Sequence, residues 1–185
     1  VLQYLVPMLE NAGAYVMLPR ERDTNTDEVI VDNDHSDSAG RTLPATSRSR
    51  GKYLEWGQWE TKGTGYADTL EIIYGQENPF RSGTSRSTAA VSGPKSKGYA
   101  SASWVPEISR DGEYAVYVSY VTASTSTEAA RYTVRHAAGE TSFIVNQKMG
   151  GGTWVYLGTF HFRKDGNSAV TLDNATPKGL SLIHI

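Results

Sequence analysis

Residues 113–121 read EYAVYVSYV, and this stretch decides the fold class. Large side chains recur at every second position, which is the period of a β-strand with one face on a hydrophobic core. The predicted core face carries Tyr114, Val116, Val118 and Tyr120. Tyr117 falls on the opposite face, where it is either exposed or covered by a second sheet.

Similar alternating stretches follow and precede this strand. The other predicted strands span residues 99–108, 131–136, 141–147, 153–162 and 168–172. Turn sequences separate them, residues 137–139 predict a hairpin between two of them, and the glycines at 150–152 read as a flexible hinge. Short strands divided by turns predict a mainly β protein built as an antiparallel sandwich.

The front of the chain follows a different pattern. Apolar residues recur at helical spacing over residues 2–9, Gly13 sits where a helix would end, and residues 14–18 (AYVML) suit a strand buried on both faces. Pro7 fits this helix only if the helix begins a few residues before it. The pattern predicts a helix–strand fragment of an α/β domain ahead of the β-rich part.

These patterns divide the chain into five predicted parts. They are a helix–strand flank at 1–23, a polar linker at 24–51, a connecting region with short strands at 52–97, the sandwich at 98–179 and a tail at 180–185. The tail reads LSLIHI, which matches the translation of a transposon end used in sequencing libraries. We interpret it as an adapter and the chain as a fragment, with a native final strand as the alternative.

Composition excludes several classes of function. The net charge of −2 and the absence of cysteine among 185 residues argue against nucleic-acid binding, disulfides and thiolate chemistry. No apolar run approaches the roughly 20 residues that span a bilayer. A mean hydropathy of −0.44 is that of a foldable, soluble composition.

The C-terminal half resembles the golvesin C-terminal-like domain, also described as the carbohydrate-binding-like domain of xanthan lyases. The resemblance covers about residues 103–172. It rests on Gly112 to Tyr114, the Tyr132-x-Val134-x-His136 spacing, Gln147, and Trp154-x-x-Leu157-Gly158-x-Phe160. It implies a jelly-roll-like sandwich that serves as an accessory module of secreted or envelope hydrolases, with sugar as the expected ligand.

The N-terminal flank resembles the zinc-dependent N-acetylmuramoyl-L-alanine amidases. Gly13, Ala14, Arg20 and Asp23 fit their pattern, whereas Pro19 replaces the expected threonine. The resemblance implies a β insertion in an amidase that hydrolyses peptidoglycan. Its zinc, held by two histidines and a glutamate, would lie in segments outside this chain, so we expect no catalytic residue, no metal site and no cofactor here.

The polar motifs of the chain support no metal site. The histidines are His35, His136, His161 and His184, and no two share a metal-ligand spacing on one element. We expect His136 to stabilise its hairpin through hydrogen bonds. The DNDHSD sequence at 32–37 lacks the glycine and glutamate of a calcium loop and reads as a solvated acidic linker, and the NAT sequon at 174–176 is a pattern only.

Aromatic residues are the remaining candidates for ligand binding, because sugar rings present apolar faces that stack on them. Trp56 and Trp59 lie outside the regular strand pattern and are the candidate substrate-binding residues. Their alternative role is packing between the insertion and the amidase core. We expect the remaining large aromatic side chains in the sandwich core: Trp104, Tyr114, Trp154, Tyr156, Phe160 and Phe162.

The sequence therefore predicts an accessory, carbohydrate-binding sandwich of a bacterial hydrolase located in the periplasm, in the cell envelope or outside the cell. Its expected partners are peptidoglycan or another polysaccharide and the remainder of an amidase domain. Two alternatives stay open. One is a stand-alone polysaccharide-binding module beside a polysaccharide lyase, and the other is a structural spacer.

Overall fold

The computed structural model describes residues 28–35, 50–67, 78–81, 83–164, 166–176 and 182–184. The predicted helix–strand flank at 1–23 lies outside these residues. Within them the chain forms β-strands and two short 3-10 helices, η1 (Asn33–His35) and η2 (Pro79–Arg81). No helix in this described part is long and apolar enough to cross a membrane.

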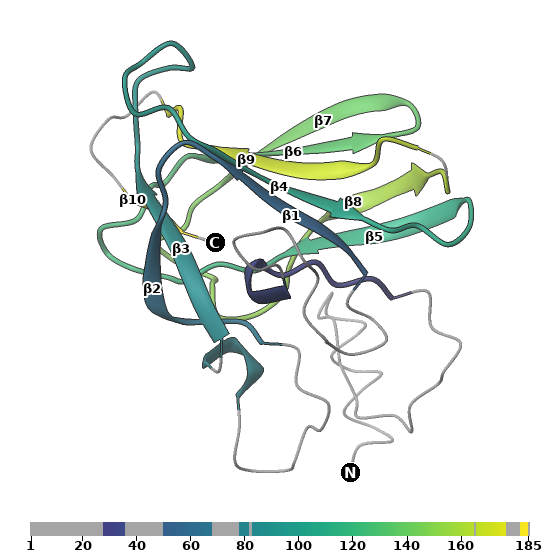
Figure 1. Cartoon of the computed structure of the whole chain (residues 1–185), viewed down its shortest axis with the longest axis horizontal. Helices are drawn as coiled ribbons and strands as arrows, with labels where there is room; N and C mark the ends of the chain where they lie inside the picture. The colour runs from purple at the N-terminus through teal and green to yellow at the C-terminus, as the bar shows by residue number, and fades with distance from the viewer. Residues whose placement is uncertain are drawn as a thin grey trace.

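The largest sheet has five strands, and all of its neighbouring pairs are antiparallel (Figure 1). Its order in space is β1 (Gly51–Trp56), β4 (Ser101–Pro106), β9 (Ala169–Asp173), β6 (Ala130–His136) and β7 (Gly139–Val145). The strands alternate between core and surface side chains, as β6 shows with buried Tyr132 and Val134 on one face. The prediction of an antiparallel β-sandwich is confirmed.

Two smaller sheets complete the described fold. A two-stranded sheet of β5 (Gly112–Val118) and β8 (Val155–Phe162) packs on the inner face of the large sheet. A three-stranded sheet of β10 (Leu182–His184), β3 (Gly83–Ala89) and β2 (Glu60–Gly65) lies at one end. The strand at 182–184 has the conformation of the native-strand alternative, and the adapter origin of this tail stays a prediction.

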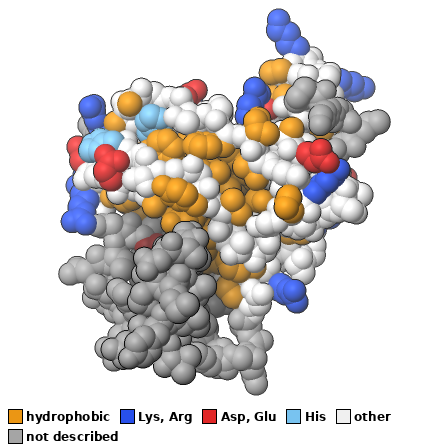
Figure 2. All heavy atoms as spheres, turned by 180° about the vertical axis from the view of Figure 1, so that it is seen from behind, with side chains coloured by type: hydrophobic (Ala, Val, Ile, Leu, Met, Phe, Trp, Pro, Cys, Tyr) orange, Lys and Arg blue, Asp and Glu red, His pale blue; other side chains and the backbone are white. Residues whose placement is uncertain are grey.

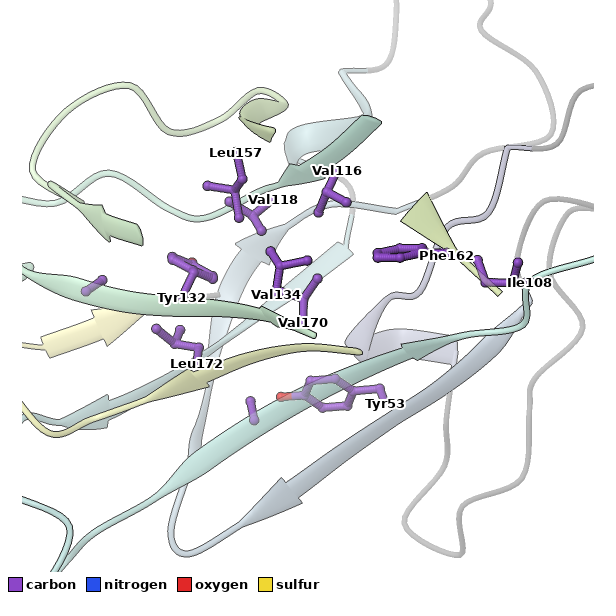
Figure 3. Close-up of a cluster of buried hydrophobic side chains, with 12 residues drawn as sticks. Tyr53, Ile108, Val116, Val118, Tyr132, Val134, Leu157, Phe162, Val170 and Leu172 are labelled. Atoms are coloured by element: carbon purple, nitrogen blue, oxygen red, sulfur yellow. The ribbon is translucent and has the colours of Figure 1, made fainter. Parts of the chain in front are cut away.

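The core lies between the five-stranded and two-stranded sheets (Figure 3). Val116, Val118 and Leu157 reach it from one side, and Tyr132, Val134 and Leu172 from the other. Tyr53 of β1 also belongs to this cluster, with 9% of its surface exposed. Burial of these side chains is the main contribution to stability, because apolar area removed from water contributes about 25 cal/mol per Å².

The predicted core face of β5 is confirmed, but that of β8 is wrong at Tyr156. Tyr156 is 54% exposed, whereas the next residue, Leu157, is buried. The pairing steps from Val116↔Gly158 to Tyr117↔Tyr156, so Leu157 is an extra residue in a β-bulge. A bulge shifts the alternation by one position, which turns Tyr156 to the surface.

The predicted hairpin and the role of His136 are confirmed. Strands β6 and β7 pair from Ala130↔Val145 to His136↔Gly139. The Ala138 backbone N–H donates to His136 Nδ1 at 3.3 Å, which leaves Nε2 to donate to Thr141 Oγ1 at 3.0 Å. His136 therefore joins the turn to both strands of its hairpin.

Residues 50–56 and 83–89 belong to the folded unit, although we placed the first across the linker and the connecting region and the second within the connecting region. β1 pairs with β4 along its whole length, and β3 carries the pairing of the three-stranded sheet. Part of the predicted solvated linker also packs: Ile30 and Asp32 are only 6% and 7% exposed. The Asp34 carboxylate accepts hydrogen bonds from the Thr84 N–H at 2.7 Å and the Thr84 hydroxyl at 2.5 Å, so it holds η1 on β3.

The glycines at 150–152 and Trp154 also differ from prediction. The Gly151 and Gly152 N–H groups donate to Thr122 Oγ1 at 2.8 Å and to the Tyr120 carbonyl at 2.9 Å, so the expected hinge is a tied turn. Trp154 packs with Tyr66 and Phe80, with ring centroids 4.7 and 5.6 Å away, rather than inside the sandwich core.

Candidate functional site

The outer face of the five-stranded sheet carries a continuous row of side chains. Register partners run from Trp56 on β1 through Ser101, Asp173 and Arg131 to Ile144 on β7. A parallel row contains Leu54, Ser103, Thr171, Thr133 and Ser142. Neighbouring strands lie about 4.8 Å apart, so each row spans roughly 19 Å of surface.

Trp56 is the most prominent aromatic side chain on this face. It is 62% exposed, and its ring lies 5.5 Å from the ring of Tyr99, which immediately precedes Ala100 and β4. Gly57 makes this contact possible, because it turns the chain with φ +84 and approaches the Ala100 backbone so closely that a Cβ would lie 2.7 Å from Ala100 Cα. Only glycine adopts such a conformation without strain.

Charged groups lie beside the aromatic pair. Arg131 Nη2 donates to Asp173 Oδ2 at 2.8 Å, and the second Asp173 oxygen accepts the Ala175 N–H at 2.9 Å. The side chain of Arg131 is 41% exposed, and that of Asp173 is 18% exposed. Burial raises the pKa of Tyr99, and the nearby Asp173 charge adds to the shift while Arg131 opposes it. The Tyr99 hydroxyl thus lies within the field of this ion pair.

We call Trp56, Tyr99, Asp173 and Arg131 the outer platform. It offers an aromatic surface for an apolar ring face and, next to it, a charged pair that can exchange hydrogen bonds with hydroxyl groups. The neighbouring row contains further hydroxyl side chains, and Thr133 Oγ1 and Ser142 Oγ lie 2.9 Å apart in it. The arrangement suits an extended ligand that is apolar on its faces and rich in hydroxyls on its edges.

Trp59, the second candidate from sequence, has a different environment. It is partly buried against the core cluster, and its indole N–H donates to the Trp56 carbonyl at 3.3 Å. Trp56 and Trp59 therefore have different environments, and ligand binding by Trp59 stays a prediction. Trp59 stabilises the turn that presents Trp56, which is closer to the packing role that we weighed as its alternative.

A partly exposed ion pair stabilises the same turn. Arg86 of β3 binds both carboxylate oxygens of Glu55 at 2.6 and 2.7 Å, and it also donates to Thr61 Oγ1 and, at 3.4 Å, to the Trp59 carbonyl. The Tyr53 hydroxyl donates to Glu55 at 2.6 Å. Burial disfavours the charge of Glu55, but the hydrogen bonds from Arg86 and Tyr53 outweigh it and lower its pKa. This network links β1, β2 and β3 beneath the outer platform.

Sequence reasoning missed three of the four residues of the outer platform. Arg131 and Asp173 lie at polar positions of alternating strands, where we looked only at the apolar positions. Tyr99 lies just before a strand, and only the turn at Gly57 brings it to Trp56. Among the described residues, no three His, Asp or Glu side chains gather in a way that could hold a metal ion.

Comparison with known proteins agrees with this fold. The family model of the Golvesin C-terminal domain matches residues 45–181. A xanthan lyase from Bacillus sp. (strain GL1) is 33% identical over 146 residues, which cover 79% of this chain and 12% of that enzyme. A solved structure of a Paenibacillus xanthan lyase matches 82% of this chain and 12% of that chain, with a TM-score of 0.55 and 20% identity, and so shares the fold. The chain thus spans about an eighth of the length of these relatives.

Proposed function

This chain belongs to the golvesin C-terminal domain family, and on that premise we propose that it is a polysaccharide-binding accessory module of a secreted or envelope-associated carbohydrate-active protein. The single observation that carries the proposal is the outer platform. Its exposed Trp56 and the Arg131–Asp173 pair lie in one register row across the sheet.

Physical complementarity supports a polysaccharide over other ligands. A pyranose ring has apolar C–H faces that stack on an indole or phenol, and equatorial hydroxyls that reach charged neighbours. A row that crosses five strands offers such contacts to several consecutive sugars. Two relatives are named as xanthan lyases, so xanthan is the first polysaccharide to test.

The experiment compares the 185-residue chain with two variants in native gels that contain soluble xanthan, with peptidoglycan sacculi in a parallel pull-down. We expect Trp56→Ala to lose about tenfold or more in affinity, because an exposed interfacial tryptophan commonly contributes more than 1.4 kcal/mol. Met149→Ala is the matched control, since Met149 is similarly exposed, at 64%, but lies in the loop after β7 and is not a register partner in the row. Unfolding temperatures should match for all three proteins. No retention by any polysaccharide would overturn the proposal and favour the structural spacer.

The amidase parent is a separate proposal that rests on residues 1–23 alone. Its support would come from the coding sequence around this segment, as a Gly-His-Gly-Gly-like segment upstream and a Ser-x-His-x-Asn-like strand downstream. The zinc expected of such a parent would be bound by those segments. A polysaccharide lyase domain upstream would contradict the amidase and make xanthan-like chains, rather than peptidoglycan, the expected ligand.

A further inference from the structure

The outer face of the two-stranded sheet carries a second aromatic surface. Its outward residues form three cross-strand pairs, Glu113↔His161, Ala115↔Thr159 and Tyr117↔Tyr156, and we call these six residues the tyrosine face. Tyr156 is 54% exposed. Figure 2, which views the molecule from behind, shows hydrophobic side chains gathered in a continuous band with histidine and acidic side chains beside one end.

A bulge in β8 creates this surface. The regular alternation of β8 would place Tyr156 in the core together with Phe160 and Phe162. The extra residue Leu157 fills the core instead and turns Tyr156 outward, opposite Tyr117. Bulges are frequent next to functional sites because they redirect a side chain, and here the redirected side chain is an exposed aromatic ring.

Hydrogen bonds and ring contacts hold the two tyrosines in place. The Tyr156 hydroxyl lies 2.8 Å from Thr159 Oγ1, three residues further along the same strand. The Tyr117 and Tyr156 rings lie 5.3 Å apart at an angle of 47°. A surface that is ordered before binding loses less conformational entropy when a ligand arrives.

Polar groups occupy the other end of the tyrosine face. Glu113 Oε1 lies 3.0 Å from His161 Nδ1, and both side chains are exposed. The His161 backbone is fixed by a hydrogen bond from the Ala137 N–H at 2.9 Å. Four residues separate Glu113 from Tyr117, so the polar pair and the tyrosine pair lie roughly 13 Å apart, with the small side chains of Ala115 and Thr159 between them.

We propose that the tyrosine face is a second polysaccharide-binding site, which makes the module bivalent. The tyrosine pair stacks on one pyranose ring, and Glu113 and His161 exchange hydrogen bonds with hydroxyls of a neighbouring sugar. The outer platform and the tyrosine face are the outer surfaces of two packed sheets and point in opposite directions. One short stretch of polysaccharide cannot touch both, so the module bridges two chains. This inference rests on the proposed function for the class of ligand.

The test uses four forms of the full chain: wild type, Trp56→Ala, Tyr156→Ala and the double variant. Affinity for soluble xanthan is measured in native gels, and bridging is measured as the rise in viscosity of a dilute xanthan solution on addition of protein. We expect each single substitution to weaken its own site about tenfold, the effect of one interfacial aromatic side chain, while the other site still binds, and the double variant to be weakened at both sites. Of these four forms, only the wild type should raise the viscosity. Tyr156→Phe, which keeps the ring, should restore most of the binding, and Met149→Ala should behave as wild type.

The possible outcomes separate this inference from the proposed function. If Trp56→Ala abolishes binding and Tyr156→Ala binds as tightly as wild type, the tyrosine face is not a site, although the outer platform stands. If Tyr156→Ala alone loses binding, the tyrosine face stands and the outer platform fails. Failure of the wild type to bind either xanthan or peptidoglycan sacculi overturns both. Matching unfolding temperatures show that each loss is local.

Discussion

Asn174 has no exposed surface, and its side-chain amide makes three hydrogen bonds to the backbone. Its oxygen accepts the Ala100 N–H at 2.8 Å, and its nitrogen donates to the carbonyls of Ala89 and Gly98, both at 2.8 Å. One side chain thus joins the end of β9 to β3 and to the start of β4. The NAT sequon pattern has this structural explanation, because the amide is inside the fold and both of its protons are in use.

We predict that Asn174→Ala is strongly destabilising. The variant leaves the buried Ala100 N–H and the carbonyls of Ala89 and Gly98 without this partner, and an unpaired buried group costs about 1–3 kcal/mol. We expect a loss of about 3 kcal/mol or more in the free energy of unfolding, measured by urea denaturation. Asn167→Ala is the control, since Asn167 is exposed, and it should change stability by less than about 0.5 kcal/mol. Similar free energies of unfolding for the two variants would show that water replaces the Asn174 amide without loss of stability.

Tyr132 and Gln147 show what sequence alone could and could not supply at this scale. Both were part of the motif on which the family resemblance rests, but the sequence did not explain why the motif contains these two residues. In the structure both are fully buried, and Gln147 Nε2 donates to the Tyr132 hydroxyl at 3.0 Å. Burial raises the pKa of Tyr132, which stays neutral. A buried pair from different elements depends on tertiary contact, so strand periodicity could not reveal it.

The turn between β1 and β2 determines where Trp56 lies. We predict that Gly57→Ala destabilises the protein and also weakens xanthan binding, because its φ of +84 and its approach to Ala100 leave no space for a Cβ. Gly152→Ala is the matched control: its φ is +70, but a Cβ there would meet nothing within 4 Å. The control should lose only about 1 kcal/mol in the free energy of unfolding, which is the cost of backbone strain.

Thermal unfolding and native gels with xanthan compare these two variants. Gly57→Ala should unfold at the lower temperature and alone should lose affinity for xanthan. Equal affinities would show that the turn does not position Trp56.

Periodicity predicted some elements well because their side chains carry the pattern. The alternation in β5 and β6 was readable since large apolar residues fill the core positions. β3 has the sequence GTSRSTA, and its buried residues are Ser85, Ser87 and Thr88. Because these side chains are polar, no alternation of apolar residues predicted a strand there. β8 was recognised as a strand, but its bulge at Leu157 depends on pairing with β5 and reversed the face of Tyr156.

The described part of the molecule is held together across the boundary that the sequence suggested at residue 98. Several links between described residues cross it. Among them are the hydrogen bond of Asn174 to the Ala89 carbonyl of β3, the cluster of Tyr66 and Phe80 with Trp154, and the pairing of β1 with β4. The sequence placed the boundary there because the segment before it is polar and rich in glycine and serine. Long-range pairing, which composition does not show, makes that segment part of the folded unit.

The last prediction follows from these links and concerns two fragments, residues 98–185 and residues 28–185. The shorter fragment lacks Tyr53, which packs in the core with its ring centroid 5.7 Å from that of Trp104, and it exposes the edge of β4 that β1 covers. It also leaves the Asn174 amide without the Ala89 carbonyl. An uncovered edge strand and an opened core favour aggregation over folding. We therefore expect residues 28–185 to unfold in one cooperative thermal transition, followed by circular dichroism, and residues 98–185 to show none. A cooperative transition in the shorter fragment would mean that β1 and β3 are additions to a sandwich that is already complete.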